Sequence, residues 1–192
     1  PGAETMYLLK ELNEKKAGEA VIVVGGETNL DEIDKLYAFL SKLGVDGFLI
    51  SPSYGYSAVH ETNPDGAAEI FMTRDDIRKK FVEAQSLFKK YKMMSSPIYL
   101  EFLSGKREIP CTAWGNPTRN VKGWKGPCYL ITDTHHDTFD GLMNDTDWDS
   151  YGHGKDPRCE HCLVHSGFEA SAALGVNGKL GDSLKMLMWQ LS

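Results

Sequence analysis

Two short apolar stretches separated by an amphipathic segment restrict the fold of this chain more than any other feature. The first, AVIVV, occupies residues 20–24, and the second, GFLIS, occupies residues 47–51. Such runs are typical of parallel strands covered on both faces, because half-exposed strands alternate apolar with polar residues. Between them, apolar residues recur every three or four positions after Thr28 or Asn29 and stop at Gly44, which predicts a helix. The sequence therefore predicts a β-α-β unit with two parallel strands.

This unit cannot stand alone, since two parallel apolar strands leave two sheet edges and an apolar face uncovered. We expect the neighbouring strands to come from residues that precede Pro1 or from a partner chain. The first residue is proline rather than methionine, so we interpret the chain as part of something longer. Parallel sheets bind ligands at the carboxyl ends of their strands. This rule points to the loops at residues 25–27 and 51–56, for which plain turn chemistry is the alternative.

The remainder is predicted to be mostly helical, apart from a polar loop at residues 57–72. Periodicity and capping residues predict further helices at residues 4–16, 73–91, 96–104, 138–143, 162–174 and 182–191. The region around the cysteines is rich in Gly, Asn, Pro and Trp. That composition indicates irregular loops arranged around a metal rather than around a core of their own.

The four cysteines of the chain are Cys111, Cys128, Cys159 and Cys162. Cys159 and Cys162 form a Cys-x-x-Cys pair, which places two sulfurs on one tight turn, and separate loops can supply the other two. Four thiolates satisfy either a tetrahedral zinc ion or a cubane iron-sulfur cluster. Zinc ribbons commonly contain two close pairs, whereas sixteen residues separate Cys111 from Cys128. The spacing therefore favours iron-sulfur, with zinc, unliganded thiols and disulfides as alternatives.

Charge and composition exclude several classes of protein. The net charge of -6 and pI near 5.5 argue against a nucleic-acid partner, since phosphate binding needs clustered Lys and Arg. No apolar run approaches the roughly 20 residues of a membrane helix. The absence of a basic and apolar leader leads us to expect a cytoplasmic location and argues against disulfides.

Histidines near the cysteines are alternative metal ligands, namely His135, His136, His153, His161 and His165.

Four stretches carry a family resemblance: GVDGFLISPSYGY (44–56), CTAWGNPTRNVKGWKGPCYL (111–130), TDWDSYGHG (146–154) and CEHCLVHSGFEA (159–170). In them the chain resembles the later part of the radical S-adenosylmethionine enzymes of hopanoid biosynthesis, the adenosyl-hopene transferase family. The resemblance implies an α/β fold in three parts. Residues 1–57 would be the last βα units of a partial (β/α) barrel, 58–105 a helical segment, and 106–192 a mostly helical, cysteine-rich extension similar to twitch and SPASM domains.

The resemblance also implies an activity and its cofactors. The intact protein would be a transferase that adds a 5′-deoxyadenosyl radical to the double bond of an apolar, hopene-like substrate. Its cofactors would be S-adenosylmethionine, an auxiliary 4Fe-4S cluster on the four cysteines, and a second 4Fe-4S cluster. The motif Cys-x3-Cys-x2-Cys, which binds that second cluster in the family, is absent from this sequence. We therefore expect a missing N-terminal half of the barrel to supply it and this portion alone to be inactive.

Five residues are candidates for binding the cofactor or substrate. Ser51, Tyr54 and Tyr56 follow the second strand and are expected at the mouth of the barrel. The resemblance places the cysteine-rich region across that mouth, which would bring Asn116 and Arg119 near the cofactor; alternatively, both only shape the loop around Cys111. Ser166 stands where the family often has a further cysteine. A non-catalytic module with four cysteine ligands, stabilised by zinc or iron-sulfur, is the second hypothesis, and the catalytic residues cannot be assigned.

Overall fold

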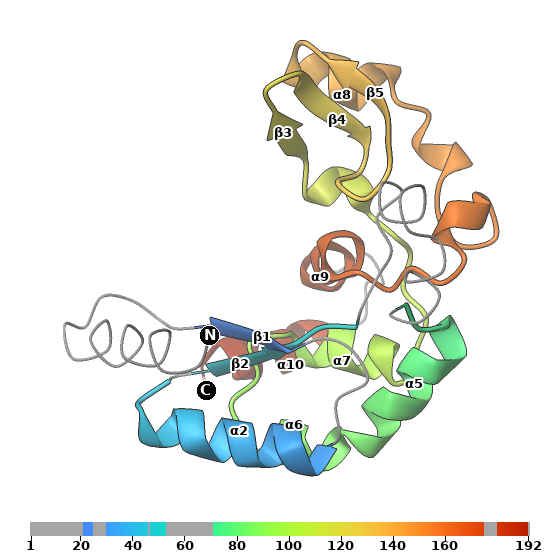
Figure 1. Ribbon diagram of the computed structural model, residues 1–192. Coiled ribbons are helices and arrows are strands. Elements are labelled where there is room, and N and C mark those ends of the chain that lie inside the picture. The colour runs from blue at the N-terminus through green and yellow to red at the C-terminus, as the bar shows by residue number, and fades with distance from the viewer. Residues whose placement is uncertain (1–20, 25–29, 46, 53–70, 175–179, 192) are drawn as a thin grey trace.

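The computed structural model describes residues 21–24, 30–45, 47–52, 71–174 and 180–191 (Figure 1). Within them the predicted β-α-β unit is confirmed. Strand β1 (Val21–Val24) pairs in parallel with β2 (Gly47–Ile50), and Ile22 lies opposite Phe48. Helix α2 (Leu30–Lys42) connects them. The predicted helix at residues 4–16 and most of the predicted loop at residues 57–72 lie outside the described residues.

A third parallel segment lies along the edge of β2 that faces away from β1. The amide of Phe48 donates to the carbonyl of Lys92 (2.9 Å), and the amide of Met94 donates to the carbonyl of Phe48 (2.8 Å). Because parallel strands end at the same edge of a sheet, this pairing brings Ser51 and Ser95 to one end. The described strands do not close a barrel, so the partial barrel remains a prediction.

The single helix predicted at residues 73–91 is wrong. The chain forms two helices, α5 (Arg74–Glu83) and α6 (Gln85–Lys90), which are separated at Ala84. The backbone of Ala84 has a ψ of 0°, far from the helical value of about −42°. The helix is interrupted at this residue, and α6 still buries Leu87 in the same core as α5. The capping prediction at Thr73 is confirmed, because its hydroxyl accepts the amide proton of Asp76.

One hydrophobic core joins the parallel strands to the later helices. Helix α7 (Pro97–Leu103) has the predicted Ser96 cap and contributes Phe102, which is fully buried. The ring of Phe102 stacks on Phe168 of α9 (His165–Ala173), with ring centroids 4.4 Å apart. Helix α10 (Leu180–Gln190) packs on α7. The cysteine-rich region is therefore anchored through α9 to the same core as β2.

The cysteine region contains a sheet that the sequence did not predict. Strands β3 (Thr118–Asn120), β4 (Gly123–Pro127) and β5 (Thr132–His136) form an antiparallel sheet in that order, packed against α8 (Phe139–Asp145). The prediction of irregular loops is wrong here. These strands are short and polar, so they lack the apolar alternation by which a strand is recognised. In Figure 1 this sheet and the parallel strands lie on opposite sides of α9.

Short 3-10 turns occupy much of the remaining connections, at η1 (Ala113–Gly115), η2 (Trp148–Ser150) and η3 (Pro157–Cys159). Helix α9 begins at His165 rather than at Cys162, because the preceding Val164 has an extended backbone. The helix predicted at residues 138–143 is confirmed as α8. Among the described residues, no helix combines the length and apolar character needed to span a membrane.

Candidate metal centre

Three segments that are distant in sequence present the four cysteines. Cys111 precedes η1, Cys128 follows β4, Cys159 ends η3, and Cys162 lies just before α9. All four are free thiols. Three of them, Cys128, Cys159 and Cys162, pack against a small cluster of buried apolar residues, namely Leu130, Ile131 and Val164. These three cysteines therefore lie at the junction between the antiparallel sheet and α9.

The thiols lie within electrostatic range of one another. The pKa of Cys162 is raised to about 12, mainly by burial and in smaller part by the negative charge of Cys111, Cys128 and Cys159. Cys111 is exposed as a whole residue, yet burial of its thiol raises the pKa to about 11, with added effects of Cys128 and Cys159. Burial also raises the pKa of Cys159. These thiols stay protonated at neutral pH unless a cation compensates the charge of the thiolates.

Backbone amides point at three of the sulfurs. The amides of Ala113, Gly152 and Val164 donate to the sulfurs of Cys111, Cys159 and Cys162, respectively, and each bond lowers the pKa of its thiol. A hydrogen bond to the charged form of a group favours that form. Hydrogen bonds to cysteine sulfurs also tune iron-sulfur clusters. The backbone is thus arranged to stabilise charge on sulfur, in opposition to the effect of burial.

The Cys-x-x-Cys turn has the compact form that the sequence predicted. The amide of Cys162 donates to the carbonyl of Cys159 (3.1 Å), and the amide of Cys159 donates to the carbonyl of Asp156 (2.9 Å). Asp156 caps η3, since its carboxylate accepts the amide proton of Arg158 (2.8 Å). Two sulfurs are thereby held on one short segment.

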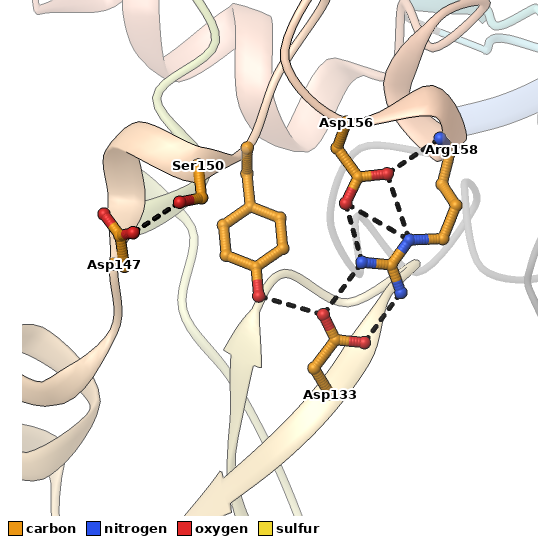
Figure 2. A network of polar contacts seen from close by, with 6 residues as sticks. Asp133, Asp147, Ser150, Asp156 and Arg158 are labelled. Atoms are coloured by element: carbon orange, nitrogen blue, oxygen red, sulfur yellow. Dashed lines mark hydrogen bonds and ion pairs between the residues drawn. The ribbon is translucent and has the colours of Figure 1, made fainter.

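A charged network fixes this turn to the antiparallel sheet (Figure 2). The guanidinium of Arg158 donates two hydrogen bonds to Asp133 of β5, at 2.7 and 2.8 Å, and others to Asp156. The hydroxyl of Tyr151 donates to Asp133 (2.9 Å). The hydrogen bonds from Arg158 hold the pKa of Asp133 and the pKa of Asp156 below the usual range for an aspartate. Because Asp133 follows the turn that carries Cys128, the network holds Cys159 toward Cys128.

Four of the histidines considered as alternative ligands, His135, His136, His153 and His161, have other polar contacts. Nδ1 of His161 accepts the amide proton of Arg74 at 3.5 Å, and Nε2 of His135 lies 3.1 Å from the side-chain amide of Asn120. In the part of the chain that the structure describes, no three His, Cys, Asp or Glu side chains are grouped closely enough to hold a metal ion. A metal bound by the four cysteines therefore requires their loops to draw closer than they are here.

The predicted cofactor-binding residues fall into two places. Ser51 is buried directly after β2, and its hydroxyl donates to the carbonyl of Pro52. Asn116 and Arg119 are exposed on the antiparallel sheet side, where Arg119 lies opposite Trp124. Tyr54 and Tyr56 lie outside the described residues. The structure thus keeps Ser51 with the parallel strands and the other two with the cysteine region.

One side chain at the strand ends was not predicted. Glu169 of α9 accepts the amide proton of Ser96 at 2.9 Å, next to the segment that pairs with β2. Burial raises the pKa of this carboxyl, and hydrogen bonds from Ser96 oppose the shift. Glu169 therefore attaches the cysteine-rich region to the carboxyl end of the parallel strands. The sequence places Glu169 on the same helical face as His165 but says nothing of its distant partner.

Comparison with known proteins identifies the family. Residues 48–186 match DUF3463, a domain of unknown function. The chain belongs to the DUF3463 family. The match begins within β2, ends within α10, and includes all four cysteines. No curated protein and no solved structure matches this DUF3463 chain.

The charged network of the DUF3463 chain yields a prediction. We expect Arg158→Gln to weaken metal retention about tenfold, the lower end for residues that support ligands, because Cys159 loses its tether to the antiparallel sheet. The unfolding free energy should fall by only about 1 kcal/mol, since the network is partly exposed to solvent. Metal content after chelator challenge and urea unfolding measure the two effects.

Lys155→Gln is the matched control for that substitution. Lys155 lies near the same turn, but its ammonium group is 3.9 Å from the fully exposed Asp149. Such exposed pairs contribute little, so neither metal retention nor stability should change. If both substitutions reduce metal retention equally, loss of positive charge near the site explains the effect and the tether does not.

Proposed function

We propose that this DUF3463 chain is the C-terminal part of a radical S-adenosylmethionine enzyme and that Cys111, Cys128, Cys159 and Cys162 bind an auxiliary 4Fe-4S cluster. The observation that supports the proposal is the placement of four thiols within electrostatic range of one another, three of which accept backbone amide protons. The family adds support, because DUF3463 is associated with radical S-adenosylmethionine-related proteins. The finer proposal, an adenosyl-hopene transferase, rests on the sequence stretches described above.

The donor set fits such a cluster in chemistry. Thiolates are the ligands that hold iron-sulfur clusters, and four of them satisfy a cubane. The raised pKa of the buried thiols means that protons must leave when the cluster binds. When bound, the cluster would supply a low-potential one-electron centre and a covalent link between the antiparallel sheet and α9. The required convergence of the loops is the step that the experiment below tests.

The chain's own residues would then shape one side of the reaction site. Ser51 ends β2, and Glu169 ties α9 to the neighbouring strand end. Both lie at the carboxyl edge of the parallel strands, which is the ligand-binding edge in such sheets. We propose that barrel strands outside this sequence bind S-adenosylmethionine with its own cluster and that the apolar substrate enters at this edge. The DUF3463 portion would close that edge without cleaving S-adenosylmethionine itself.

A structural metal site is the second candidate. The observation that favours it is the position of the sulfurs: Cys128 directly follows strand β4 of the antiparallel sheet, whereas Cys162 lies just before α9. Any tetrahedral ion bound by these thiols would cross-link the two, as structural zinc does in small domains. In this case the module would contribute to folding or to contact with a partner, and it would need no redox chemistry.

Anaerobic reconstitution separates the two candidates. We expect the chain treated with iron and sulfide to become brown and to retain about four irons and four sulfides, as a 4Fe-4S cluster ligated by four cysteines requires. Electron paramagnetic resonance after reduction would identify the cluster type. A colourless protein that retains one zinc under the same conditions would establish the structural site instead. A chain that retains neither metal would reject both candidates.

A further inference from the structure

The segment that carries Cys111 is attached to the first turn of α9. Thr112 donates twice to the carbonyl of Gly167, through its amide (2.9 Å) and through its hydroxyl (3.0 Å). Thr112 is almost fully buried. One residue further, the amide of Ala113 donates to the sulfur of Cys111. These bonds fix the backbone that follows the sulfur relative to Gly167.

Gly167 leaves room for that sulfur. A Cβ atom at this position would lie 2.6 Å from the Sγ atom of Cys111, and real Cβ atoms essentially never approach another heavy atom so closely. Gly167 lies within helix α9 and has no positive φ, so its backbone conformation is open to any residue. Glycine weakens a helix interior relative to alanine. What glycine provides here is the absence of a side chain.

We propose that Gly167 is a positioning residue that seats the sulfur of Cys111 on the first turn of α9 and so directs it toward Cys162. The inference rests on the proposed four-thiol site, which it deepens. Cys162 lies three residues before α9, at the same end of the helix as Gly167. A larger residue at position 167 displaces the Cys111 sulfur by rotation about the Cα–Cβ bond. The fourth thiol then leaves the group.

The chain offers two matched glycines as controls. A Cβ at Gly181 of α10 would meet nothing within 4 Å, so Gly181→Ala changes helix propensity alone. A Cβ at Gly115 of η1 would lie 2.8 Å from the Cβ of Ala170, one turn further along α9. Gly115→Ala therefore disturbs the packing of the same segment on α9 without touching sulfur. Comparison of Gly167→Ala with these two controls therefore separates the effects of helix propensity, of packing on α9 and of the position of the Cys111 sulfur.

The first test measures metal retention and thiol exposure. Gly167→Ala should weaken metal retention about 10- to 100-fold, the range for residues that orient ligands. In the metal-free chain, it should accelerate alkylation of Cys111 by iodoacetamide, measured by mass spectrometry, because the displaced sulfur moves out of its seat. In Gly181→Ala, Cys111 should be alkylated at the wild-type rate, and in Gly115→Ala the acceleration should be smaller than in Gly167→Ala. Unchanged alkylation and unchanged metal retention in Gly167→Ala would overturn the proposal.

The second test holds even if the wild-type chain binds no metal. In urea unfolding of metal-free chains, Gly167→Ala should stabilise the protein in a Cys111→Ala background by as much as Gly181→Ala does. In the presence of Cys111 that gain should be lost, because the new Cβ meets the sulfur. Equal effects of Gly167→Ala in both backgrounds would show that Gly167 and Cys111 do not interact. If the effects of Gly167→Ala and Cys111→Ala on the unfolding free energy are coupled but no variant binds metal, the proposed cluster is rejected. The contact between position 167 and the Cys111 sulfur would still be supported.

Discussion

The Cys162→Ser substitution is expected to abolish metal binding at the proposed four-cysteine site and to loosen residues 111–174, while the β1–α2–β2 unit stays folded. The sulfur of Cys162 is buried and accepts the amide proton of Val164, so a serine hydroxyl fills its place without supplying a soft ligand. Thiolate sites couple metal binding to folding. Metal analysis and hydrogen exchange of the cysteine region would show both losses.

The expected effect is large compared with the stability of the domain. Metal binding by four-ligand zinc sites contributes about 10–16 kcal/mol in small peptides, whereas whole domains are stable by about 5–15 kcal/mol. Removing one of four ligands therefore affects the region more than most packing changes do. Cys159→Ser should have the same result.

Val164→Ala is the matched control for the cysteine substitutions. It removes two methyl groups from the same apolar cluster but leaves the backbone amide that contacts Cys162. It should lower the unfolding free energy by about 1–3 kcal/mol and leave metal content unchanged. Full metal content in both Cys159→Ser and Cys162→Ser would refute the proposed ligand set.

The parts of the fold that the sequence predicted correctly are determined by residues that are close together in the chain. The apolar runs that became β1 and β2 were recognisable because buried parallel strands need no polar face. The helix starts at Thr73 and Ser96 followed from side chains that can cap an amide. The Cys-x-x-Cys turn likewise depends on residues adjacent in sequence.

The parts that the sequence did not predict depend on distant contacts. Strand β5 reads TDTHH, and nothing in it identifies a strand until β4 supplies its hydrogen bonds. The interruption between α5 and α6 at Ala84 contains no proline or glycine from which it could be predicted. The positions of Gly167 against Cys111 and of Glu169 against Ser96 join residues more than 50 apart. A pattern of types and spacings contains no information on such pairs.

The candidate site residues Ser51, Asn116 and Arg119 show the same difference between positions set by local rules and positions set by distant contacts. The position of Ser51 followed from a rule about parallel strands, and the structure keeps it at their carboxyl end. The positions of Asn116 and Arg119 were inferred from a family resemblance, and both are exposed beside the antiparallel sheet. Their role in cofactor binding stays a prediction, whereas Glu169 links the cysteine region to the strand ends directly.

Phe102→Ala is expected to destabilise the protein by about 3–5 kcal/mol, the usual cost of truncating a buried aromatic residue. The ring of Phe102 is fully buried, stacks on Phe168 at 4.4 Å, and lies beneath the guanidinium of Arg74, 5.3 Å from the ring centroid. Its loss opens a cavity between α7 and α9. Because α9 begins next to Cys162 and contacts Cys111 through Gly167, metal retention should fall as well, although no ligand is changed.

Phe139→Ala distinguishes this coupling from the general loss of an aromatic contact. Phe139 of α8 also contacts an aromatic ring, that of Trp124 at 5.3 Å, but 44% of the residue is exposed. Its removal should reduce the unfolding free energy by no more than about 1.5 kcal/mol and leave metal retention intact. Urea unfolding and metal analysis of both variants decide the matter. If Phe102→Ala destabilises the core but retains metal as the wild type does, α9 does not transmit core packing to the cysteines, and the metal centre is held by its own loops.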